Sequence, residues 1–275
     1  NKEKIALVET LDNGSLLSMN NHFMVKRAAH NIRFFAEWAE KLQGDCWSSQ
    51  DVQYNVHYEA SGVSALITPW NAPFMLTTWK VGPALAAGNT IVVKPPEWAP
   101  LTCSLLADFA EEAGIPSGVI NIIQGIGEEA GAELVNHPLV SRISFTGSTD
   151  TGKEIGIAAA RRIVPVSMEL GGKSPLIIFA DSDFDLSVTT ALRQFDHAGQ
   201  ICLAGTRLVV EESISEKFLK KFSQKAKELK LGNPLDKGTN IGPLISGEPF
   251  ERVYGFVERA KAEGAIPLFG SSRSE

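Results

Sequence analysis

Short apolar segments alternate with helix-like stretches through the middle of this 275-residue chain, and no other feature limits the fold as strongly. Such segments are typical of strands in a parallel sheet, because helices cover both faces of that sheet and leave few polar positions. We therefore expect an α/β fold built on a parallel sheet. The expected strands are 62–68, 89–95, 119–125, 141–147 and 164–170.

A second strand–helix series is expected after this sheet. Residues 175–179 and 206–212 are short apolar segments of the same kind. A helix is expected over 213–229, because Ser213 and Glu216 have the spacing of a capping box, in which each side chain bonds the backbone N–H of the other residue.

Two elements are expected before the parallel sheet. Residues 25–42 carry apolar side chains at helical spacing and are followed by Gly44, which predicts an amphipathic helix. Its expected apolar face consists of Ala28, Ile32, Phe35, Ala39 and Leu42. Residues 52–58 alternate apolar or aromatic side chains with polar ones, which predicts a half-buried strand. That strand can pair within its own sheet or at a subunit edge.

Composition and charge exclude several kinds of partner. The net charge of −6 argues against a nucleic-acid partner, and 44% hydrophobic residues is ordinary for a globular protein. An apolar run of about 18 residues, which a membrane helix needs, is absent from the sequence. Three widely spaced cysteines fit a reducing cytoplasm, and the histidines are too far from the cysteines and from one another to predict a metal site.

Cys202 is the first candidate for chemistry. It lies in the stretch HAGQICLAGT, residues 197–206, among small and apolar residues. A free cysteine in such surroundings is either a reactive nucleophile or a buried, inert side chain. The stretch alone leaves both interpretations open.

Two glycine-containing turns are candidates for binding a phosphate. In FTGSTDTG, residues 145–152, Gly147 lets the backbone approach an anion and Ser148 adds a hydroxyl at the start of a helix. The alternative is that Ser148 is an ordinary N-cap. GIGEEA, residues 125–130, fits a dinucleotide fingerprint, but two glutamates stand where backbone amides would meet a pyrophosphate. A plain glycine-rich turn is the preferred interpretation there.

Polar side chains at other strand ends suggest further roles. Lys94 and Glu97 both reach a ribose if they face a ligand, and Glu97 would repel a 2′-phosphate; the alternative is a solvated loop pair. Glu169 ends an apolar strand, and partial desolvation there suits a general base; the alternative is a buried glutamate paired with a lysine. Asn71 offers a side-chain N–H to an oxyanion, or forms an Asx-turn.

Together these motifs resemble those of the NAD(P)-dependent aldehyde dehydrogenase superfamily, in the family's order and across nearly the whole chain. The motifs are ITPWNAPF (67–74), VVKPPE (92–97), FTGSTDTG (145–152), MELGGKSP (168–175) and GQICLAGTR (199–207). Within the family, residues 19–43 and the segments PFMLTTWKVGPALAAG and GNPLDKGTNIGPLIS resemble the branch that acts on 5-carboxymethyl-2-hydroxymuconate semialdehyde.

The resemblance implies roles for individual residues. Cys202 is the implied nucleophile and Glu169 the general base. Asn71 and the backbone N–H of Cys202 are the implied oxyanion hole, and Lys80 belongs to a proton-relay network. The implied NAD site consists of Trp70, Lys94, Glu97, Gly147 and Ser148. The implied substrate contacts are Phe74, Met75 and Leu203.

The resemblance also implies a domain organisation. A Rossmann-like NAD-binding domain is expected over residues 1–49 and 61–170, a strand of an oligomerisation element over 50–60, and the first part of an α/β catalytic domain over 171–275. The family's downstream EIFGP motif does not occur in the sequence, and its N-terminal strands are also missing, so the chain looks like the middle of an aldehyde dehydrogenase. The full-length protein is expected to be a cytoplasmic homodimer or homotetramer.

The expected function is NAD-dependent oxidation of an aldehyde to a carboxylate, through a thiohemiacetal and then a thioester on Cys202. The expected substrate is 5-carboxymethyl-2-hydroxymuconate semialdehyde, from the breakdown of aromatic compounds. The alternatives are a broad-specificity aldehyde dehydrogenase, a thiol esterase or acyltransferase that needs no nucleotide, and an inactive truncated protein. NAD binding separates the dehydrogenases from the esterase.

Overall fold

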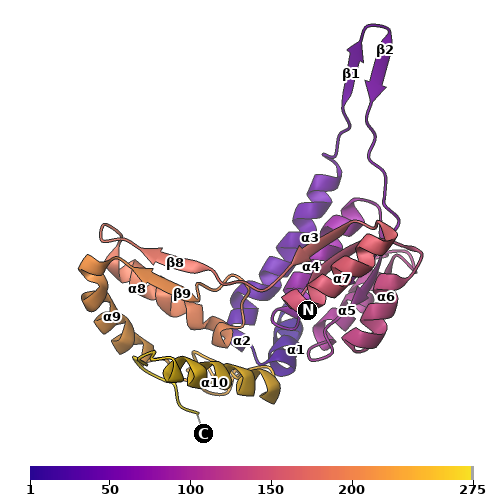
Figure 1. Ribbon diagram of the computed structural model, residues 1–275. Helices are drawn as coiled ribbons and strands as arrows, with labels where there is room; N and C mark the ends of the chain where they lie inside the picture. The colour runs from indigo at the N-terminus through magenta and orange to yellow at the C-terminus, as the bar shows by residue number, and fades with distance from the viewer. Residues whose placement is uncertain (274–275) are drawn as a thin grey trace. The chain divides into compact units, whose positions relative to one another are not determined.

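The computed structural model describes residues 1–273, which form two compact units (Figure 1). Unit 1 comprises Asn1–Asn13 and Met19–Leu170, and unit 2 comprises Gly14–Ser18 and the chain from Gly171 onward. In this described part of the chain, no helix has the length and apolar character needed to cross a membrane.

Unit 1 is built on a parallel five-stranded sheet with the strand order β5–β4–β3–β6–β7. The strands are β3 (Val63–Ile67), β4 (Thr90–Lys94), β5 (Ile120–Ile122), β6 (Val140–Thr146) and β7 (Val166–Glu169). They coincide with the five expected strands to within a few residues, so the parallel α/β prediction is confirmed. Ile67 pairs with both Lys94 and Phe145, so the carboxyl ends of the central strands are level.

Helices cover both faces of this sheet. They are α4 (Pro73–Ala86), α5 (Leu101–Glu112), α6 (Ala132–Asn136) and α7 (Thr149–Arg162). Successive side chains of β3 point to opposite faces. Leu66 packs with Val81 of α4, whereas Ala65 and Ile67 belong to the cluster that contains Ile155 of α7. The sheet therefore has one apolar core on each face.

The N-terminal part of unit 1 adds α1 (Lys2–Asn13), the π-helical turn η1 (Asn20–Met24) and α3 (Val25–Ala39). The short helix α2 (Leu17–Met19) connects α1 to η1, and its first two residues belong to unit 2. The expected helix over 25–42 is present, but it ends at Ala39. The face predicted for it is partly wrong: Ile32, Ala39 and Leu42 are exposed, while Asn31 is buried. The reason is that Asn31 enters the interface with α4 by donating a hydrogen bond to the hydroxyl of Thr78 at 3.3 Å.

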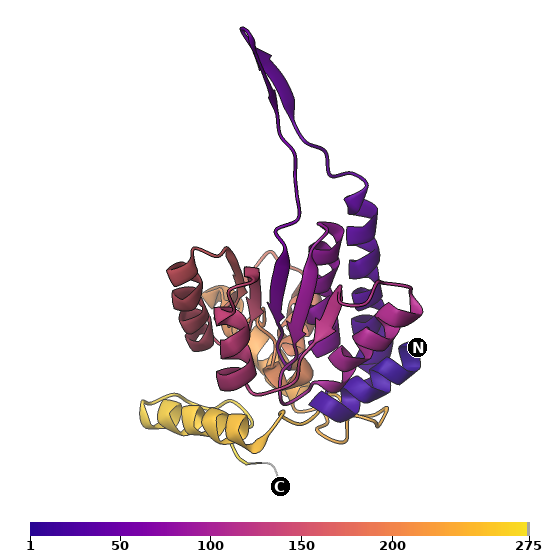
Figure 2. The same cartoon turned by 90° about the vertical axis from the view of Figure 1, so that its right-hand side faces the viewer.

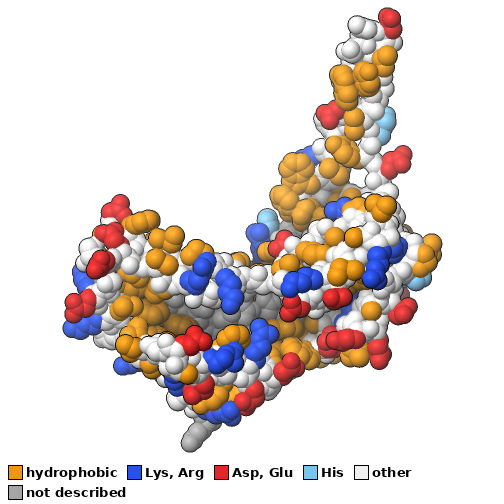
Figure 3. All heavy atoms as spheres, in the orientation of Figure 1, with side chains coloured by type: hydrophobic (Ala, Val, Ile, Leu, Met, Phe, Trp, Pro, Cys, Tyr) orange, Lys and Arg blue, Asp and Glu red, His pale blue; other side chains and the backbone are white. Residues whose placement is uncertain are grey.

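An antiparallel hairpin of β1 (Cys46–Ser49) and β2 (Val52–Asn55) projects from the rest of unit 1 (Figures 1 and 2). The strand expected over 52–58 is present at Val52–Asn55, but every residue of both strands is exposed, so the expected half-burial is wrong. Aromatic side chains of the two strands contact each other instead. Trp47 pairs with Tyr54, and their rings stack with centroids 5.1 Å apart. Hydrophobic side chains consequently cover much of the hairpin surface (Figure 3).

Unit 2 contains a parallel strand pair, β8 (Pro175–Ile178) and β9 (Arg207–Val210), at the positions expected for the second series. Its helical elements are α8 (Phe184–Leu192), the 3-10 helix η3 (Arg193–Gly199), α9 (Glu212–Ala226) and α10 (Gly247–Ala262). Ile178, Val188 and Phe218 form the centre of its apolar core. This core joins β8 to α8 and α9.

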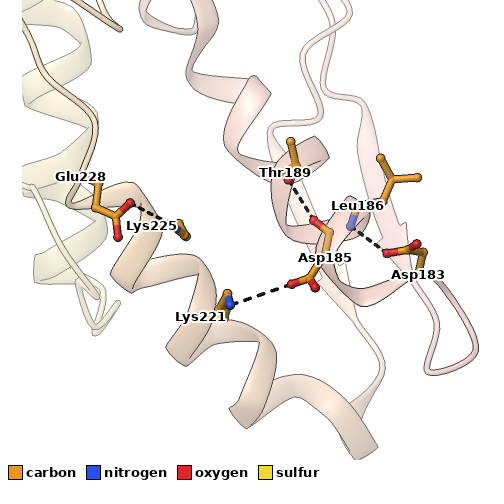
Figure 4. A network of polar contacts seen from close by, with 7 residues as sticks. All are labelled: Asp183, Asp185, Leu186, Thr189, Lys221, Lys225 and Glu228. Carbon is orange, nitrogen blue, oxygen red and sulfur yellow. Dashed lines mark hydrogen bonds and ion pairs between the residues drawn. The ribbon is translucent and has the colours of Figure 1, made fainter. Parts of the chain in front are cut away.

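Polar contacts fix the helices of unit 2 (Figure 4). Asp183 caps α8 by accepting a hydrogen bond from the Leu186 amide at 2.9 Å, and Lys221 of α9 lies 3.9 Å from the Asp185 carboxylate of α8. The capping box expected at Ser213 is wrong, because α9 begins at Glu212. The Ser213 hydroxyl donates to the Glu211 carboxylate at 2.7 Å instead.

Candidate functional site

Polar side chains gather at the carboxyl edge of the sheet in unit 1. Strands β3, β4, β6 and β7 are parallel and in register, so the residues that follow them emerge at one edge. The predicted site residues at or just beyond this edge are Trp70, Asn71, Lys94, Glu97, Gly147, Ser148 and Glu169. Ligands of open parallel α/β sheets bind at such an edge.

Lys94 and Glu97 form an ion pair there, with Nζ 3.2 Å from Oε2. Lys94 is 2% exposed, and its Nζ also donates to the Pro95 carbonyl at 2.8 Å. Glu97 is exposed. The alternative of a solvated loop pair is therefore wrong for Lys94, because a buried ammonium holds the exposed carboxylate in place. A fixed carboxylate of this kind can accept hydrogen bonds from sugar hydroxyls.

Gly147 and Ser148 lead from β6 into α7. A Cβ atom on Gly147 would lie 2.5 Å from the Phe145 ring, so only glycine fits this turn without rearrangement. Ser148 is the N-cap of α7, and its Oγ accepts from the Thr151 amide at 3.1 Å. The alternative interpretation of Ser148 as a cap is thus confirmed. The cap occupies the Thr151 amide but leaves the amides of Thr149 and Asp150 and the positive end of the helix dipole to interact with an anion.

The second glycine turn is unsuited to a phosphate. Residues 127–131 form a π-helical turn, and Glu128 and Glu129 occupy its first turn. Two carboxylates at a helix N-terminus would repel an anionic ligand. This agrees with the preferred interpretation of GIGEEA as a structural turn.

Lys80 of α4 lies close to the same edge and contacts strand β6 through its side chain. It is 7% exposed and donates from Nζ to the Ser144 hydroxyl of β6 at 2.9 Å. Burial lowers the pKa of Lys80 to about 8, although the negative charge of Glu169 opposes this shift. Sequence reasoning missed Ser144, because its role depends on a contact between α4 and β6.

Glu169 departs from its expected surroundings. It is exposed, so the partial desolvation predicted from its apolar strand is wrong for the described chain. The reason is that β7 is an edge strand of the sheet, and its side chains are alternately half-buried and exposed. Glu169 and Lys80 nevertheless interact electrostatically, although exposed Glu169 is not the buried glutamate of the alternative interpretation.

The predicted substrate and cofactor contacts near Asn71 differ in exposure. Phe74 and Met75, in the first turn of α4, are buried, at 7% and 9% exposed. Trp70 is partly buried, and its ring centroid lies 6.1 Å from that of Trp98. Phe74 and Met75 are therefore largely shielded from solvent, whereas Trp70 is partly accessible.

Cys202 lies in a turn of unit 2, three residues after the end of η3 at Gly199. It is exposed, so the interpretation as a buried filler is wrong. A Cβ atom on Gly172 would lie 2.2 Å from the backbone oxygen of Cys202, so the backbones at 172 and 202 are in close contact. The adjacent Leu203, a predicted substrate contact, is 72% exposed.

Cys103 of α5 is the buried cysteine of this chain. It is fully buried, and burial raises its pKa to about 12. A thiol with such a pKa is protonated at neutral pH and is a poor nucleophile. The contrast with exposed Cys202 separates the structural thiol from the candidate nucleophile.

A cavity of about 350 Å³ lies between α3 and α4, and sequence reasoning missed it. Its lining residues are Arg27, His30, Asn31, Phe34, Phe35 and Trp79. The five lining residues on α3 recur at helical spacing, but polar and aromatic side chains at such spacing are also typical of a solvated helix surface. Only the packing of α4 against α3 distinguishes the two.

Trp79, the lining residue on α4, lies near the middle of that helix, and the Arg27 end of the cavity extends toward the start of α4. Asn31 contacts Thr78, and Phe35 contacts Gly82, so the paired residues of the two helices advance together. The helices therefore run parallel, and this register places Arg27 level with Phe74. Phe74 is three residues after Asn71, which is less than one helical turn.

Comparisons with known proteins agree on a single family. A family model described as "Aldehyde dehydrogenase family" matches residues 1–275. Betaine aldehyde dehydrogenase 1 of Oryza sativa subsp. japonica is 44% identical over 280 residues, covering 100% of this chain and 55% of the relative. Aminoaldehyde dehydrogenase 2, peroxisomal, of Malus domestica is 43% identical, covering 100% and 56%. The chain spans about half the length of the curated relatives it matches.

Solved structures give the same result for the fold. A crystal structure from Burkholderia cenocepacia is similar, with a TM-score of 0.98 at 41% identity, covering 100% of this chain and 57% of that one. The NAD⁺ complex of an aldehyde dehydrogenase from Bacillus cereus has a TM-score of 0.97 at 39% identity, covering 100% and 56%.

Proposed function

Because the chain belongs to the aldehyde dehydrogenase family, we propose that the protein oxidises an aldehyde to a carboxylate with NAD⁺ as the hydride acceptor. The observation that carries this proposal is the exposed Cys202 on a turn that packs against Gly172. An exposed thiol on a constrained turn suits a nucleophile, whereas the buried Cys103 does not.

The residues at the sheet edge fit an NAD⁺ molecule. The glycine turn at Gly147 and the first amides of α7 suit its pyrophosphate, and the fixed Glu97–Lys94 pair suits the hydroxyls of a ribose. The negative charge of Glu97 opposes a 2′-phosphate, so we propose NAD⁺ rather than NADP⁺. When bound, the nicotinamide supplies the acceptor for a hydride. Trp70, beside this edge, would lie against the cofactor.

The protein's own residues would then perform four tasks. Glu169 accepts the Cys202 thiol proton, and the thiolate adds to the aldehyde carbon to form a thiohemiacetal. The side-chain amide of Asn71 and the backbone N–H of Cys202 donate to its oxyanion. Departure of the hydride leaves a thioester, which water hydrolyses after Glu169 accepts a proton from that water. Lys80 relays the proton onward.

The variant Cys202→Ala tests the nucleophile. It should abolish aldehyde oxidation and leave the affinity for NAD⁺ within about twofold, because the thiol forms the covalent bond but does not hold the cofactor. NADH formation at 340 nm and a binding titration measure the two quantities.

Cys46→Ala is the matched control, since Cys46 is also exposed but lies on the hairpin. Turnover by Cys202→Ala would refute the assignment, and an unmutated protein that hydrolyses thioesters without binding NAD⁺ would favour the esterase alternative.

For the substrate we propose an aldehyde that also carries a carboxylate, such as 5-carboxymethyl-2-hydroxymuconate semialdehyde. The support is the cavity between α3 and α4, where Arg27 and His30 lie beside the aromatic side chains of Phe34 and Trp79. A guanidinium is always charged and binds carboxylates by two parallel hydrogen bonds. A carbon chain whose aldehyde lies near Asn71 would extend along α4, past Met75, toward Arg27.

A second candidate is a broader aldehyde dehydrogenase that accepts amino- or betaine aldehydes, which the names of the relatives favour. The ratio of kcat/KM for a dicarboxylic semialdehyde to that for betaine aldehyde distinguishes the two. A carboxylate contact at Arg27 should make this ratio at least about ten, and Arg27→Met should remove most of the preference for the dicarboxylic semialdehyde. Arg33→Met, which changes an exposed arginine of α3 outside the cavity lining, is the control. A ratio near one in the unmutated protein would exclude the carboxylate-specific enzyme and support the broader candidate.

We also propose that the protein is a cytoplasmic homodimer or homotetramer. Cys46, Cys103 and Cys202 are free thiols, which fits a reducing compartment. The hairpin exposes two unpaired strand edges and the apolar side chains Trp47, Val52 and Tyr54. Exposed edges of this kind pair readily with another chain.

A further inference from the structure

Two buried polar side chains of helix α1 form three hydrogen bonds with the backbone of residues 70–74. The Asn13 side chain donates from Nδ2 to the carbonyls of Trp70 and Asn71, at 3.3 Å each. The Glu9 carboxylate accepts from the Phe74 amide, also at 3.3 Å. Glu9 and Asn13 are four residues apart on α1, so both face the same segment, and they are only 2% and 1% exposed.

The start of α4 needs these contacts from elsewhere in the chain. Its N-cap residue is Ala72, whose methyl side chain cannot accept a hydrogen bond, and Pro73 follows. The Phe74 amide is one of the donors that a helix leaves unpaired at its N-terminus. Glu9 therefore serves as an N-cap from another helix, and its carboxylate is placed favourably at the positive end of the α4 dipole.

Glu9 is itself held in place. Its second carboxylate oxygen accepts from the hydroxyl of Thr102, in the first turn of α5. One carboxylate thus joins α1, α4 and α5. A buried carboxylate is costly unless hydrogen bonds compensate it, so the geometry around Glu9 is tightly defined.

We infer that Glu9 and Asn13 are positioning residues, which fix the backbone of residues 70–74 and so aim the Asn71 side chain at the oxyanion of the reacting aldehyde. This inference rests on the proposed function. An oxyanion donor is effective only when it is held at the position where charge develops, so a loosened backbone at Asn71 weakens it.

A double-mutant cycle between Asn13 and Asn71 tests this inference. Asn13→Ala should lower kcat by about tenfold and leave the Kd for NAD⁺ within about twofold. In an Asn71→Ala background the same substitution should cost little more, because the side chain that Asn13 positions is already gone. An equal loss in both backgrounds, or no loss in either, would overturn the inference.

Asn20→Ala is the matched control. Asn20 is a buried asparagine at 1% exposed, and its Nδ2 donates to the Thr10 hydroxyl of α1 at 2.9 Å. This variant should lose stability with kcat within about twofold of the unmutated protein. A loss as large as that of Asn13→Ala would point to a general structural effect and overturn the positioning role.

Hydrogen exchange of the Phe74 amide gives a readout that does not depend on activity. Glu9→Gln retains an oxygen that accepts from this amide and should keep its exchange slow, whereas Glu9→Ala should accelerate it by about tenfold or more. Amides of α7 should be unaffected in both variants. Equal exchange in the two variants would refute the contact as a cap, even if the protein is active. An unmutated protein that oxidises no aldehyde would refute the proposed function instead, while the exchange result would still stand.

Discussion

Glu9 is an acid in a position that solvent does not reach. Burial raises its pKa from 4.5 to about 7, although hydrogen bonds from Thr102 and the Phe74 amide oppose the shift. Because the folded protein holds this proton more tightly than the unfolded chain, the stabilisation is complete below pH 4.5 and is lost as the pH rises through 7. The free energy of unfolding should fall by about 3 kcal/mol across this range on account of Glu9.

Urea unfolding at pH 5 and pH 8 measures this effect. Glu9→Gln should remove the dependence, because glutamine resembles the protonated acid and retains an acceptor for the Phe74 amide. The variant should therefore be more stable than the unmutated protein at pH 8 and similar to it at pH 5. Glu3→Gln is the control, since Glu3 is an exposed glutamate of the same helix. An unchanged difference between the two pH values in Glu9→Gln would contradict the prediction.

Lys80 should give the proposed reaction a pH dependence near neutrality. Its pKa is lowered to about 8 by burial, so its amine becomes neutral and able to accept a proton as the pH rises through 8. We expect kcat to rise through this range. Ser144→Ala removes the hydroxyl that accepts from the charged amine, which lowers the pKa further and should move the inflection to lower pH. A profile whose inflection is the same in Ser144→Ala would show that Lys80 is not the titrating group.

At the scale of elements, the turn that carries Cys202 depends on its contact with Gly172. A Cβ at this position would lie 2.2 Å from a backbone oxygen, which flexible side chains cannot relieve. Gly172→Ala should displace the turn and lower kcat by at least about 100-fold, since a misplaced nucleophile loses its alignment. Gly171→Ala is the matched control, because a Cβ there meets open space among the described residues. Similar activity in the two variants would show that this contact does not position Cys202.

The elements differ in how far the sequence could predict them. The five strands of the parallel sheet were predictable because each is a short apolar run, and the residues after β3, β4 and β6 carry polar motifs at one edge. The capping box at Ser213 failed because the Glu211 carboxylate takes the Ser213 hydroxyl and the Ala180 amide, a contact between distant residues. Local patterns therefore predicted the elements well and their ends less well.

At the scale of the whole molecule, the missed features all require knowledge of which helices pack together. The cavity beside Arg27 exists because α3 runs parallel to α4, and the support for residues 70–74 exists because α1 lies against α4 and α5. Glu9 and Asn13 are in a helix whose sequence pattern resembles an ordinary solvated surface. Their burial follows from tertiary packing, which periodicity within one segment cannot reveal.

The hairpin provides the last prediction, because its apolar side chains have no core to join within unit 1. Trp47 and Tyr54 are 49% and 43% exposed, and replacing both by serine should leave the free energy of unfolding of a monomer nearly unchanged. If the hairpin mediates the proposed assembly, the double variant should dissociate to monomers, because it loses the apolar area that would cover the strand edges of a second subunit. Light scattering coupled to gel filtration measures the mass.

Trp38→Ser, at a tryptophan of α3 that is 47% exposed, is the matched control and should retain the native mass. A double variant that also retains it would exclude the hairpin as the oligomerisation element.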